Sequence, residues 1–417
     1  IPVPLQLSHQ PIPGQRQIRL TPRGQLIQPL MVPIPPHASR NGRNNRKEGH
    51  DKERALGDSS DHGFRLHNRP CIDQPCALQG GMQPFSLSPL DPDFVQNPYP
   101  AYAAARAGDA LRHWTDYDMA ATFDAATIQS LLRDRRLGRE KPPQAQTAYP
   151  DHIQDWAQTE IHSMLDMEPP RHTRLRGLVL RAFTSRRIAN LRPDIDAVTA
   201  DLLADLPKDT FDLIPAFCSQ VPVRIIARLL GVPESMSADL LRWSNAMVAM
   251  YMAGRTRAVE DAANQAARDF SAFLRRYVDK RRTDPRDDLI THLIAAEEDG
   301  AKLSTDELIG TCILLLNAGH EATVHSLGNA TKCLLEHNTP RAALAPDAIA
   351  GTVEEILRFD PPLHLFTRYA YEDVTIRGHV LKRGDEIALV LGAAGRDPAI
   401  WDHPDRFDPS RPVKPHA

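Results

Sequence analysis

The chain has 417 residues, of which 41% are hydrophobic and 25% charged, which is enough for a large buried core and ordinary for a globular enzyme. The formal net charge of -3 gives no indication of nucleic-acid or anionic-membrane binding. No apolar run reaches the roughly 18–20 residues that span a bilayer, and the amino terminus lacks the basic-then-apolar pattern of a secretory signal. We therefore expect a soluble, cytoplasmic protein.

The cysteines are scattered rather than grouped at metal-ligand spacings, at Cys71, Cys76, Cys218, Cys312 and Cys333. This distribution suits a reducing compartment better than a disulfide framework. Cys71 and Cys76 form a C-x4-C pair, but a zinc site of that kind needs a second pair of ligands, which the sequence lacks.

Residues 1–81 differ in amino-acid composition from the rest of the chain. They hold 11 of the 36 prolines, carry 11 Lys and Arg residues against 6 Asp and Glu residues, and show no apolar periodicity. Such a segment buries too little apolar surface to offset the entropy lost on ordering. We expect it to be disordered or a non-native upstream extension, with Met82 as the natural start and residues 82–417 as the folded domain. A functional basic arm is the alternative.

From Met82 onward the hydrophobic pattern is mostly helical. The expected helices span residues 98–107, 125–133, 173–183, 195–206, 214–230, 240–252, 258–281, 304–336 and 352–359. The helix after Ser304 begins with a capping box, since Glu307 follows three residues later. At roughly 32 residues, or about 48 Å, this helix can cross a whole domain.

After Pro362 the pattern changes to short apolar runs separated by turns such as Gly378-His379. The expected strands span residues 364–369, 374–376, 380–381 and 386–391. Residues 397–417 are rich in proline and polar residues and are expected to form an ordered coil. The predicted fold class is mainly α with a small antiparallel β region.

The segment Ala318-Gly319-His320-Glu321-Ala322-Thr323 lies in the middle of the long predicted helix. A glycine there costs about 1 kcal/mol relative to alanine, and a charged glutamate is costly to bury unless it faces a cavity. Together they favour a helix that loosens beside a ligand pocket, where Glu321 relays protons. The alternative is a packed helix with a close crossing at Gly319 and a paired glutamate.

His320-Glu321 also resembles the start of the zinc-hydrolase motif H-E-x-x-H. The second histidine would occupy the position of Val324, whereas the nearby histidine is His325. Residues i and i+5 of a helix are separated by about 140°. We therefore expect the two histidines to point to different faces and not to share a zinc ion, and a zinc hydrolase is kept as an alternative that metal analysis would exclude.

Three further groups of residues are candidates for ion pairing or for binding an anionic ligand. Glu355 and Arg358, at i and i+3, share one side of a helix and can pair. His172 and Arg176, at i and i+4 at the front of a helix, suit a carboxylate or phosphate ligand, although a solvated basic face is equally consistent. Arg368 lies in a predicted strand, where a lone arginine usually points to solvent.

The order and separation of these motifs resemble the cytochrome P450 family, best its soluble bacterial class. The series is Asp166-x-x-Pro169-Pro170-x-His172-Thr173-Arg174-x-Arg176, Ala318-Gly319-His320-Glu321, Glu355-x-x-Arg358, Arg368 and Pro404-Asp405-Arg406-Phe407. The resemblance covers about Met82 to Ala417. It implies a haem-dependent monooxygenase that inserts one atom of dioxygen into a small apolar organic substrate, with electrons from NAD(P)H through a reductase and a ferredoxin-type partner.

The resemblance also implies which residues would contact haem. His172 and Arg176 would bind its propionates from one side, and Arg368 would do so from the strand. Ala318 and Gly319 would lie over the ring and leave room for dioxygen.

Further roles implied by the resemblance concern protons and support of the haem-binding core. Glu321 would occupy the proton-delivery position, with Thr323 as its catalytic neighbour. Glu355, Arg358 and Arg406 would form a structural ion-pair network.

Two departures from the family pattern stand out. The family usually places a threonine directly after the acidic residue, where this chain has Ala322; Thr323 comes one position later, about 100° around the helix. We therefore expect altered coupling of electrons to product. In addition, the iron-ligating cysteine of the family, with its loop and the helix that follows, is expected beyond Ala417. We therefore expect the chain as given to be a fragment that does not bind haem normally and is inactive, although the family is one of enzymes; an inactive fragment or pseudoenzyme is the alternative to an active monooxygenase.

Overall fold

The fold is described here from a computed structural model of the chain. The structure describes residues 81–146, 148–183, 185–298 and 301–416. The extension expected over residues 1–81, including Cys71 and Cys76, lies outside these residues except for Gly81. Met82, the expected start of the folded domain, has a buried side chain and directly precedes the first strand.

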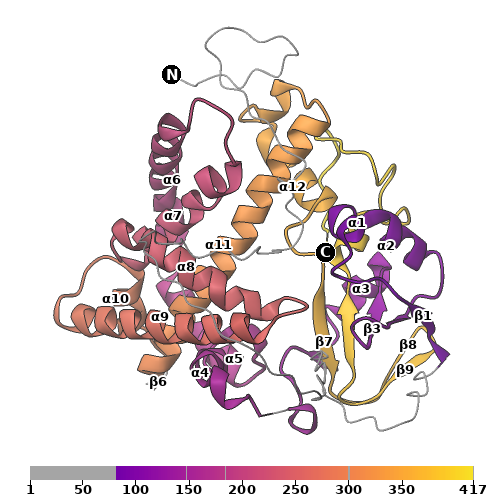
Figure 1. Cartoon of the computed structure of the whole chain (residues 1–417), viewed down its shortest axis with the longest axis horizontal. Coiled ribbons are helices and arrows are strands. Elements are labelled where there is room, and N and C mark those ends of the chain that lie inside the picture. The colour runs from indigo at the N-terminus through magenta and orange to yellow at the C-terminus, as the bar shows by residue number, and fades with distance from the viewer. Residues whose placement is uncertain (1–80, 147, 184, 299–300, 417) are drawn as a thin grey trace, which may run out of the picture.

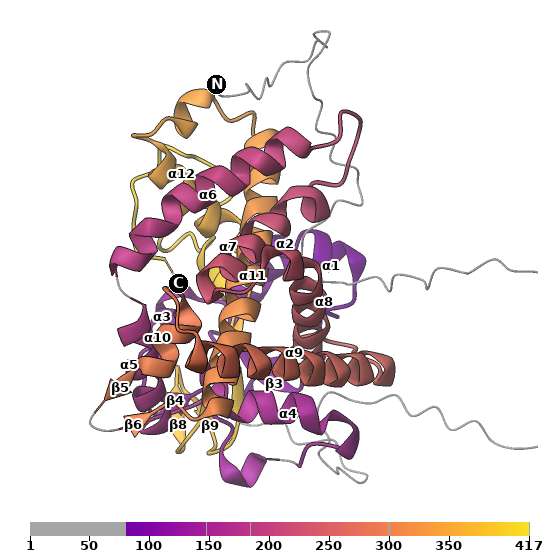
Figure 2. The same ribbon diagram turned by 90° about the vertical axis from the view of Figure 1, so that its left-hand side faces the viewer.

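Helices make up most of the molecule, and one long helix, α11, passes through its centre (Figure 1 and Figure 2). The α-helices are α1 (Pro92–Gln96), α2 (Tyr99–Arg106), α3 (Ala125–Leu131), α4 (Gln154–Ile161), α5 (Arg171–Ala182), α6 (Ser185–Asp205), α7 (Gln220–Leu230), α8 (Ser237–Val248), α9 (Arg257–Thr283), α10 (Leu289–Ala295), α11 (Thr305–Glu336), α12 (Ile349–Phe359) and α13 (Leu391–Ala394).

The long helix is confirmed with its expected cap. The Glu307 backbone N–H donates to Ser304 Oγ at 3.1 Å, and the Ser304 backbone N–H donates to Glu307 Oε2 at 2.8 Å. These reciprocal bonds satisfy two of the donors that a helix start leaves unpaired. The helix then continues for 32 residues without interruption.

Other helices differ from the expectation. The helix expected at 195–206 begins at Ser185 and includes Pro193, although proline disfavours a helix interior. The single helix expected over 214–230 is a π-helical turn at Ile214–Cys218 followed by α7. The helices α1, α4, α10 and α13 were not predicted. Helices this short give a weak periodic signal, which located α2 and α3 but not these four.

The strands form one larger sheet and two small hairpins. The strands are β1 (Gln83–Phe85), β2 (Arg112–Trp114), β3 (Met119–Thr122), β4 (Leu137–Gly138), β5 (Glu297–Glu298), β6 (Ala301–Lys302), β7 (Phe366–Ala370), β8 (Val374–Ile376), β9 (His379–Leu381) and β10 (Glu386–Leu389). The larger sheet has the order β1-β2-β3-β10-β7-β4.

The mainly helical class with a small β region is confirmed, and the larger sheet is mixed. β7 and β10 pair antiparallel, with Arg368 opposite Ile387. β3 pairs parallel to β10, with Ala120 opposite Ile387. The sheet therefore joins strands from the beginning and the end of the described chain, and it holds β7, which carries Arg368, at a fixed register.

The largest apolar core lies where α7, α8, α9, α10 and α11 meet. Trp243 of α8 stacks on Phe270 of α9 with ring centroids 5.3 Å apart, and Leu316 of α11 is fully buried. Fully burying an apolar side chain such as Phe or Leu contributes about 1.5–3 kcal/mol. This packing fixes the position of α11 between the other helices and the side of the molecule that holds the larger sheet (Figure 1).

Within the described ranges, none of the helices combines the length and the apolar character needed to cross a lipid bilayer.

Candidate active site

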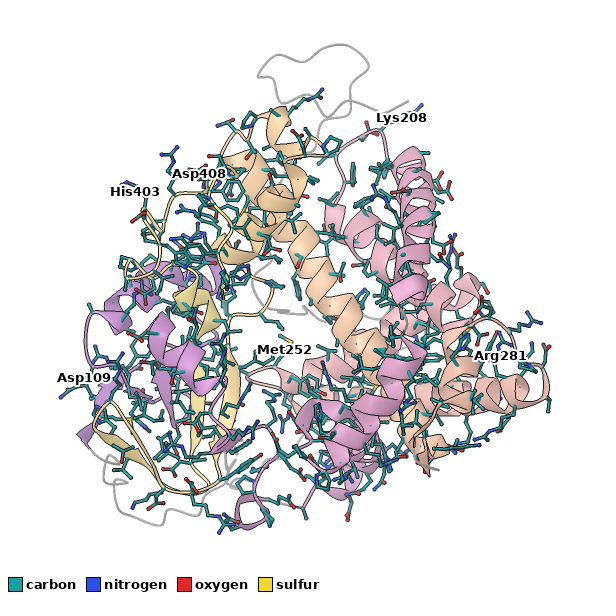
Figure 3. All side chains as sticks on the ribbon, turned by 180° about the vertical axis from the view of Figure 1, so that it is seen from behind. Asp109, Lys208, Met252, Arg281, His403 and Asp408 are labelled. Carbon is teal, nitrogen blue, oxygen red and sulfur yellow. The ribbon has the colours of Figure 1, made fainter. Side chains whose placement is uncertain are left out.

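A stripe of small residues is exposed in the middle of α11. Ala318, Gly319 and Thr323 are exposed, whereas Leu316 and His320, which flank them in sequence, are buried. Figure 3 shows α11 passing between the helices and the sheet, with Met252, in the segment between α8 and α9, lying between α11 and the strands. An exposed stripe inside an otherwise packed helix leaves room for a ligand.

Gly319 and Thr323 are linked within this stripe. A Cβ atom at Gly319 would lie 3.2 Å from Cδ1 of Ile226 on α7, so a larger side chain would press on that helix. The Thr323 hydroxyl donates to the Gly319 carbonyl at 2.7 Å. Because α11 stays helical here, the loosening expected at Gly319 is absent, and the close crossing considered as the alternative is present.

The Glu321 carboxylate lies between two histidines of α11. Its Oε1 atom is 3.7 Å from His320 Nδ1, and its Oε2 atom is 3.4 Å from His325 Nε2. Burial opposes ionisation and is the largest single influence, but the two histidines together outweigh it and lower the pKa of Glu321 to about 2. Glu321 is therefore a carboxylate at neutral pH.

The two histidines, expected on different faces of the helix, both contact Glu321 because each approaches a different carboxylate oxygen. In the part of the chain that the structure describes, no three or more His, Cys, Asp or Glu side chains are grouped so that they could hold a metal ion.

Arg368 lies on β7, as expected, but its side chain is half-buried rather than solvated. Its Nη1 donates to the Thr367 carbonyl at 2.8 Å, the one hydrogen bond of this side chain among the described residues. Burial, and then the nearby Arg139 guanidinium, lowers the pKa of Arg368. Arg139 is itself paired, since it donates to Asp166 Oδ1 at 2.6 Å. A half-buried guanidinium with spare donors suits an anionic ligand.

His172 and Arg176 lie on α5, one turn apart, as the sequence predicted. His172 is half-buried and Arg176 is exposed. Neither side chain forms a hydrogen bond or ion pair with any described residue, so both keep their donors for another group. No hydrogen bond joins them to Arg368 in the described ranges.

Glu355 and Arg358 form the expected pair on α12, and both are buried. Arg358 Nε donates to Glu355 Oε2 at 2.7 Å, and Nη2 donates to Oε1 at 2.8 Å. The other donors of Arg358 reach the carbonyls of Gly395 at 2.7 Å, Pro404 at 2.9 Å and Arg406 at 3.2 Å. The pair therefore ties α12 to the coil that ends the described chain.

The third side chain of this cluster is Arg411, whereas the sequence had predicted Arg406. Arg411 Nε lies 3.2 Å from Glu355 Oε2, and Arg411 is only 12% exposed in its side chain. Arg406 is exposed and contributes its backbone carbonyl, which accepts from Arg358 and from Arg411. The reason is a turn in which the Arg406 backbone N–H donates to the His403 carbonyl, with the Arg406 carbonyl pointing inward and its side chain outward.

Comparison with known proteins extends the resemblance seen in the sequence. The family model described as Cytochrome P450 matches residues 349–417. The vitamin D(3) 25-hydroxylase of Pseudonocardia autotrophica is 39% identical over 325 residues, which cover 76% of this chain and 78% of that protein. The polyketide biosynthesis cytochrome P450 PksS of Bacillus subtilis (strain 168) is 34% identical over 348 residues, covering 80% and 84%.

Solved structures give the same answer for the fold. P450BioI, crystallised in complex with an acyl carrier protein ligated to hexadec-9Z-enoic acid, has a TM-score of 0.72 at 32% identity, over 78% of this chain and 85% of that one. Fold and relatives together define an enzyme of the P450 monooxygenase class. The chain belongs to the cytochrome P450 family, and it resembles bacterial members.

Haem is the cofactor that this family implies, and part of the site fits it. Arg368, His172 and Arg176 have donors that no described residue uses, as carboxylate groups would require. The exposed small residues of α11 leave space beside a flat ring.

The described cysteines do not fit iron ligation. Cys218, Cys312 and Cys333 are buried and unpaired, and burial raises the pKa of each thiol to about 12. An iron ligand must be a thiolate. These three residues are packed in the apolar interior.

Proposed function

We propose that the chain serves a haem-thiolate monooxygenase reaction that inserts one atom of dioxygen into a small apolar organic substrate. The observation that carries this proposal is the exposed stripe of Ala318, Gly319 and Thr323 beside the ionised Glu321 in the middle of α11. When bound, haem supplies the binding and activation of dioxygen. The tasks left to the chain are to hold the cofactor, orient the substrate and deliver protons.

Cofactor binding falls to Arg368, His172 and Arg176, which would hold the haem propionates. The spare donors of all three residues support this role, and for Arg368 a half-buried guanidinium without a carboxylate partner is also costly. Ala318 and Gly319 would lie over the ring, where a larger side chain at position 318 would fill the space.

Proton delivery falls to Glu321, with Thr323 beside it. Glu321 is an anion at neutral pH, and its carboxylate oxygens would accept hydrogen bonds from water and orient that water for proton transfer. The Thr323 hydroxyl is engaged with the Gly319 carbonyl, and Ala322 carries no hydroxyl. Proton transfer would therefore depend mainly on Glu321, water or the substrate.

Support of the haem-binding core falls to the cluster of Glu355 and Arg358, joined by the carbonyl of Arg406 and the side chain of Arg411. Electrons would come from NAD(P)H through a reductase and a ferredoxin-type donor. We place the protein in the cytoplasm, which the three unpaired cysteines of the described residues support.

The proposal is tested with the purified chain supplied with haem, NADPH, a surrogate ferredoxin and its reductase under 18-O-labelled dioxygen. Vitamin D3, the substrate in the name of one relative, is included in a panel of apolar compounds. Mass spectrometry should find one labelled oxygen in a product. Haem uptake without a labelled product from any compound in the panel would contradict the proposal.

The alternative is an inactive fragment or pseudoenzyme, and haem titration separates the two. Arg368→Ala should weaken haem binding by roughly 10–100-fold, since a hydrogen bond to a charged group contributes about 1.5–3 kcal/mol. Arg383→Ala, which removes an exposed arginine of the same β region, is the matched control and should leave haem binding unchanged. No haem uptake by the parent chain would favour the alternative.

A further inference from the structure

The carboxylate of Glu321 has a third neighbour, which comes from a different helix. Asn245 lies on α8, which packs against α11. In the amide orientation that satisfies its surroundings, Asn245 Nδ2 donates to Glu321 Oε1 at 3.1 Å and to the Leu241 carbonyl at 3.3 Å. Asn245 is the one contact to this carboxylate from outside α11 among the described residues.

The surroundings of Glu321 are poor in other donors. His320 is buried, and neither of its ring nitrogens forms a hydrogen bond within the described residues. His325 Nε2 stands 3.4 Å from the carboxylate, which is longer than a good hydrogen bond. The Asn245 amide, at 3.1 Å, is therefore the closest donor that Glu321 has.

The charges around Glu321 come from its own helix. The titratable groups that act on it are His320 and His325, both on α11. The α8 residue that reaches it, Asn245, is a neutral amide. Glu321 is therefore flanked by two imidazoles of its own helix and by one neutral amide donor from α8.

From this arrangement we propose that Asn245 is a positioning residue for the monooxygenase reaction, holding the Glu321 carboxylate turned towards α8. The role of Asn245 in catalysis rests on the proposed function, but its effect on the Glu321 carboxyl group can be measured without haem. A carboxylate fixed by one amide has one orientation, which is what a proton relay needs. Without the amide, Glu321 would be free to change its orientation and would accept a proton more readily.

The first measurement is the protonation of Glu321, read by infrared spectroscopy in the full chain without haem. Each spectrum is compared with that of the same variant carrying Glu321→Gln, so that the remaining band belongs to this carboxyl group. Spectra are recorded from pH 8 down to pH 3, and over this range the parent should stay largely ionised, because the pKa of Glu321 is about 2. Asn245→Asp should show a protonated carboxyl band, because two carboxylates about 3 Å apart cannot both stay ionised.

Asn245→Leu removes the donor while keeping the size of the side chain. It should raise the pH at which the Glu321 carboxyl group becomes protonated by roughly one to two units, which corresponds to the loss of one hydrogen bond to a charged group. Ser244→Ala, the neighbour on α8 whose buried hydroxyl has no described partner, is the control and should match the parent. Asn245→Gln, which can still donate, should restore part of the effect.

The same variants are then compared after haem loading. Asn245→Asp should lower the fraction of electrons that reach product, while haem affinity stays within twofold of the parent. The proposal is overturned if Asn245→Asp shows no protonated band and Asn245→Leu behaves like Ser244→Ala. If the infrared result holds but no variant, including the parent, forms product, the proposed function fails while the role of Asn245 in positioning Glu321 stands.

Discussion

The middle of α11 and the end of α12 differ in how fully their buried polar side chains are hydrogen-bonded. At the end of α12, every N–H donor of Arg358 has an acceptor, and Glu355 also accepts from the Asp408 backbone at 2.8 Å. In the middle of α11, both ring nitrogens of His320 and one of His325 are buried without a hydrogen-bond partner among the described residues.

This difference distinguishes a structural cluster from a functional one. A buried ion pair contributes to stability only when its remaining donors and acceptors are satisfied, as they are around Glu355. Unsatisfied polar groups are costly and persist where a ligand or a reaction uses them. The same reasoning sets Arg368, which has one acceptor, apart from Arg358, which has five.

The largest expected effect is at Arg358. Arg358→Leu leaves the Glu355 carboxylate buried with a reduced set of partners, and it should lower the free energy of unfolding by about 3–5 kcal/mol. Urea unfolding followed by circular dichroism measures this. Arg133→Leu, at an exposed arginine, serves as the control. A loss below about 1 kcal/mol would show that the α12 cluster is not the structural one.

A matched pair tests the finding that Arg411, rather than Arg406, completes the cluster. Arg411→Ala should cost about 1–3 kcal/mol of unfolding free energy, because its buried guanidinium bonds to Glu355 are lost. Arg406→Ala keeps the backbone carbonyl and should change stability by less than about 0.5 kcal/mol. Equal losses in the two variants, measured by the same urea titration, would contradict this assignment.

On the α11 side, Ala322→Thr restores a hydroxyl directly after Glu321. In the haem-loaded chain it should raise the fraction of electrons recovered in product and lower peroxide release, because a positioned hydroxyl assists proton transfer. Product and peroxide are measured together per NADPH consumed. Unchanged values of both would show that position 322 has no part in coupling.

A pH-dependent effect concerns Glu160 of α4, whose carboxyl group has a single side-chain donor among the described residues, since Tyr251 Oη donates to it at 2.7 Å. Burial raises its pKa from 4.5 to about 7. Between these values the folded chain binds more protons than the unfolded chain, so this group's contribution to stability falls as pH rises from 4.5 to 7.

Glu160→Gln should therefore gain stability relative to the parent as pH rises through this window. Urea midpoints at pH 5 and pH 7.5 measure the change, with Glu372→Gln at an exposed site as the control. If Glu160→Gln keeps the pH dependence of the parent, the raised pKa is refuted.

Local signals in the sequence predicted part of this fold well. The start of α11 follows from Ser304 and Glu307, whose spacing defines a capping box. The pairing of Glu355 with Arg358 follows from the i, i+3 geometry of a helix. In both cases the interacting groups lie within one turn of each other, so the sequence alone determines their contact.

Features that depend on distant partners could not be predicted in this way. β3 and β10 pair parallel through Ala120 and Ile387, which are far apart in sequence and carry no mutual signal. Arg411 and Asn245 reach their carboxylates only after the coil and α8 have packed. The site motifs of α11 were found because glycine and glutamate are unusual in an apolar helix, whereas an asparagine on an amphipathic helix is not.

The central claim is that the middle of α11 and strand β7 form one site for haem. Hydrogen exchange of the full chain, with and without added haem, tests it most directly. We expect slower exchange in peptides that cover Ala318–Thr323 and Phe366–Ala370, with little change around Glu355 and Arg358, whose groups are already satisfied. Slower exchange confined to the Glu355 region, with α11 and β7 unaffected, would contradict the account.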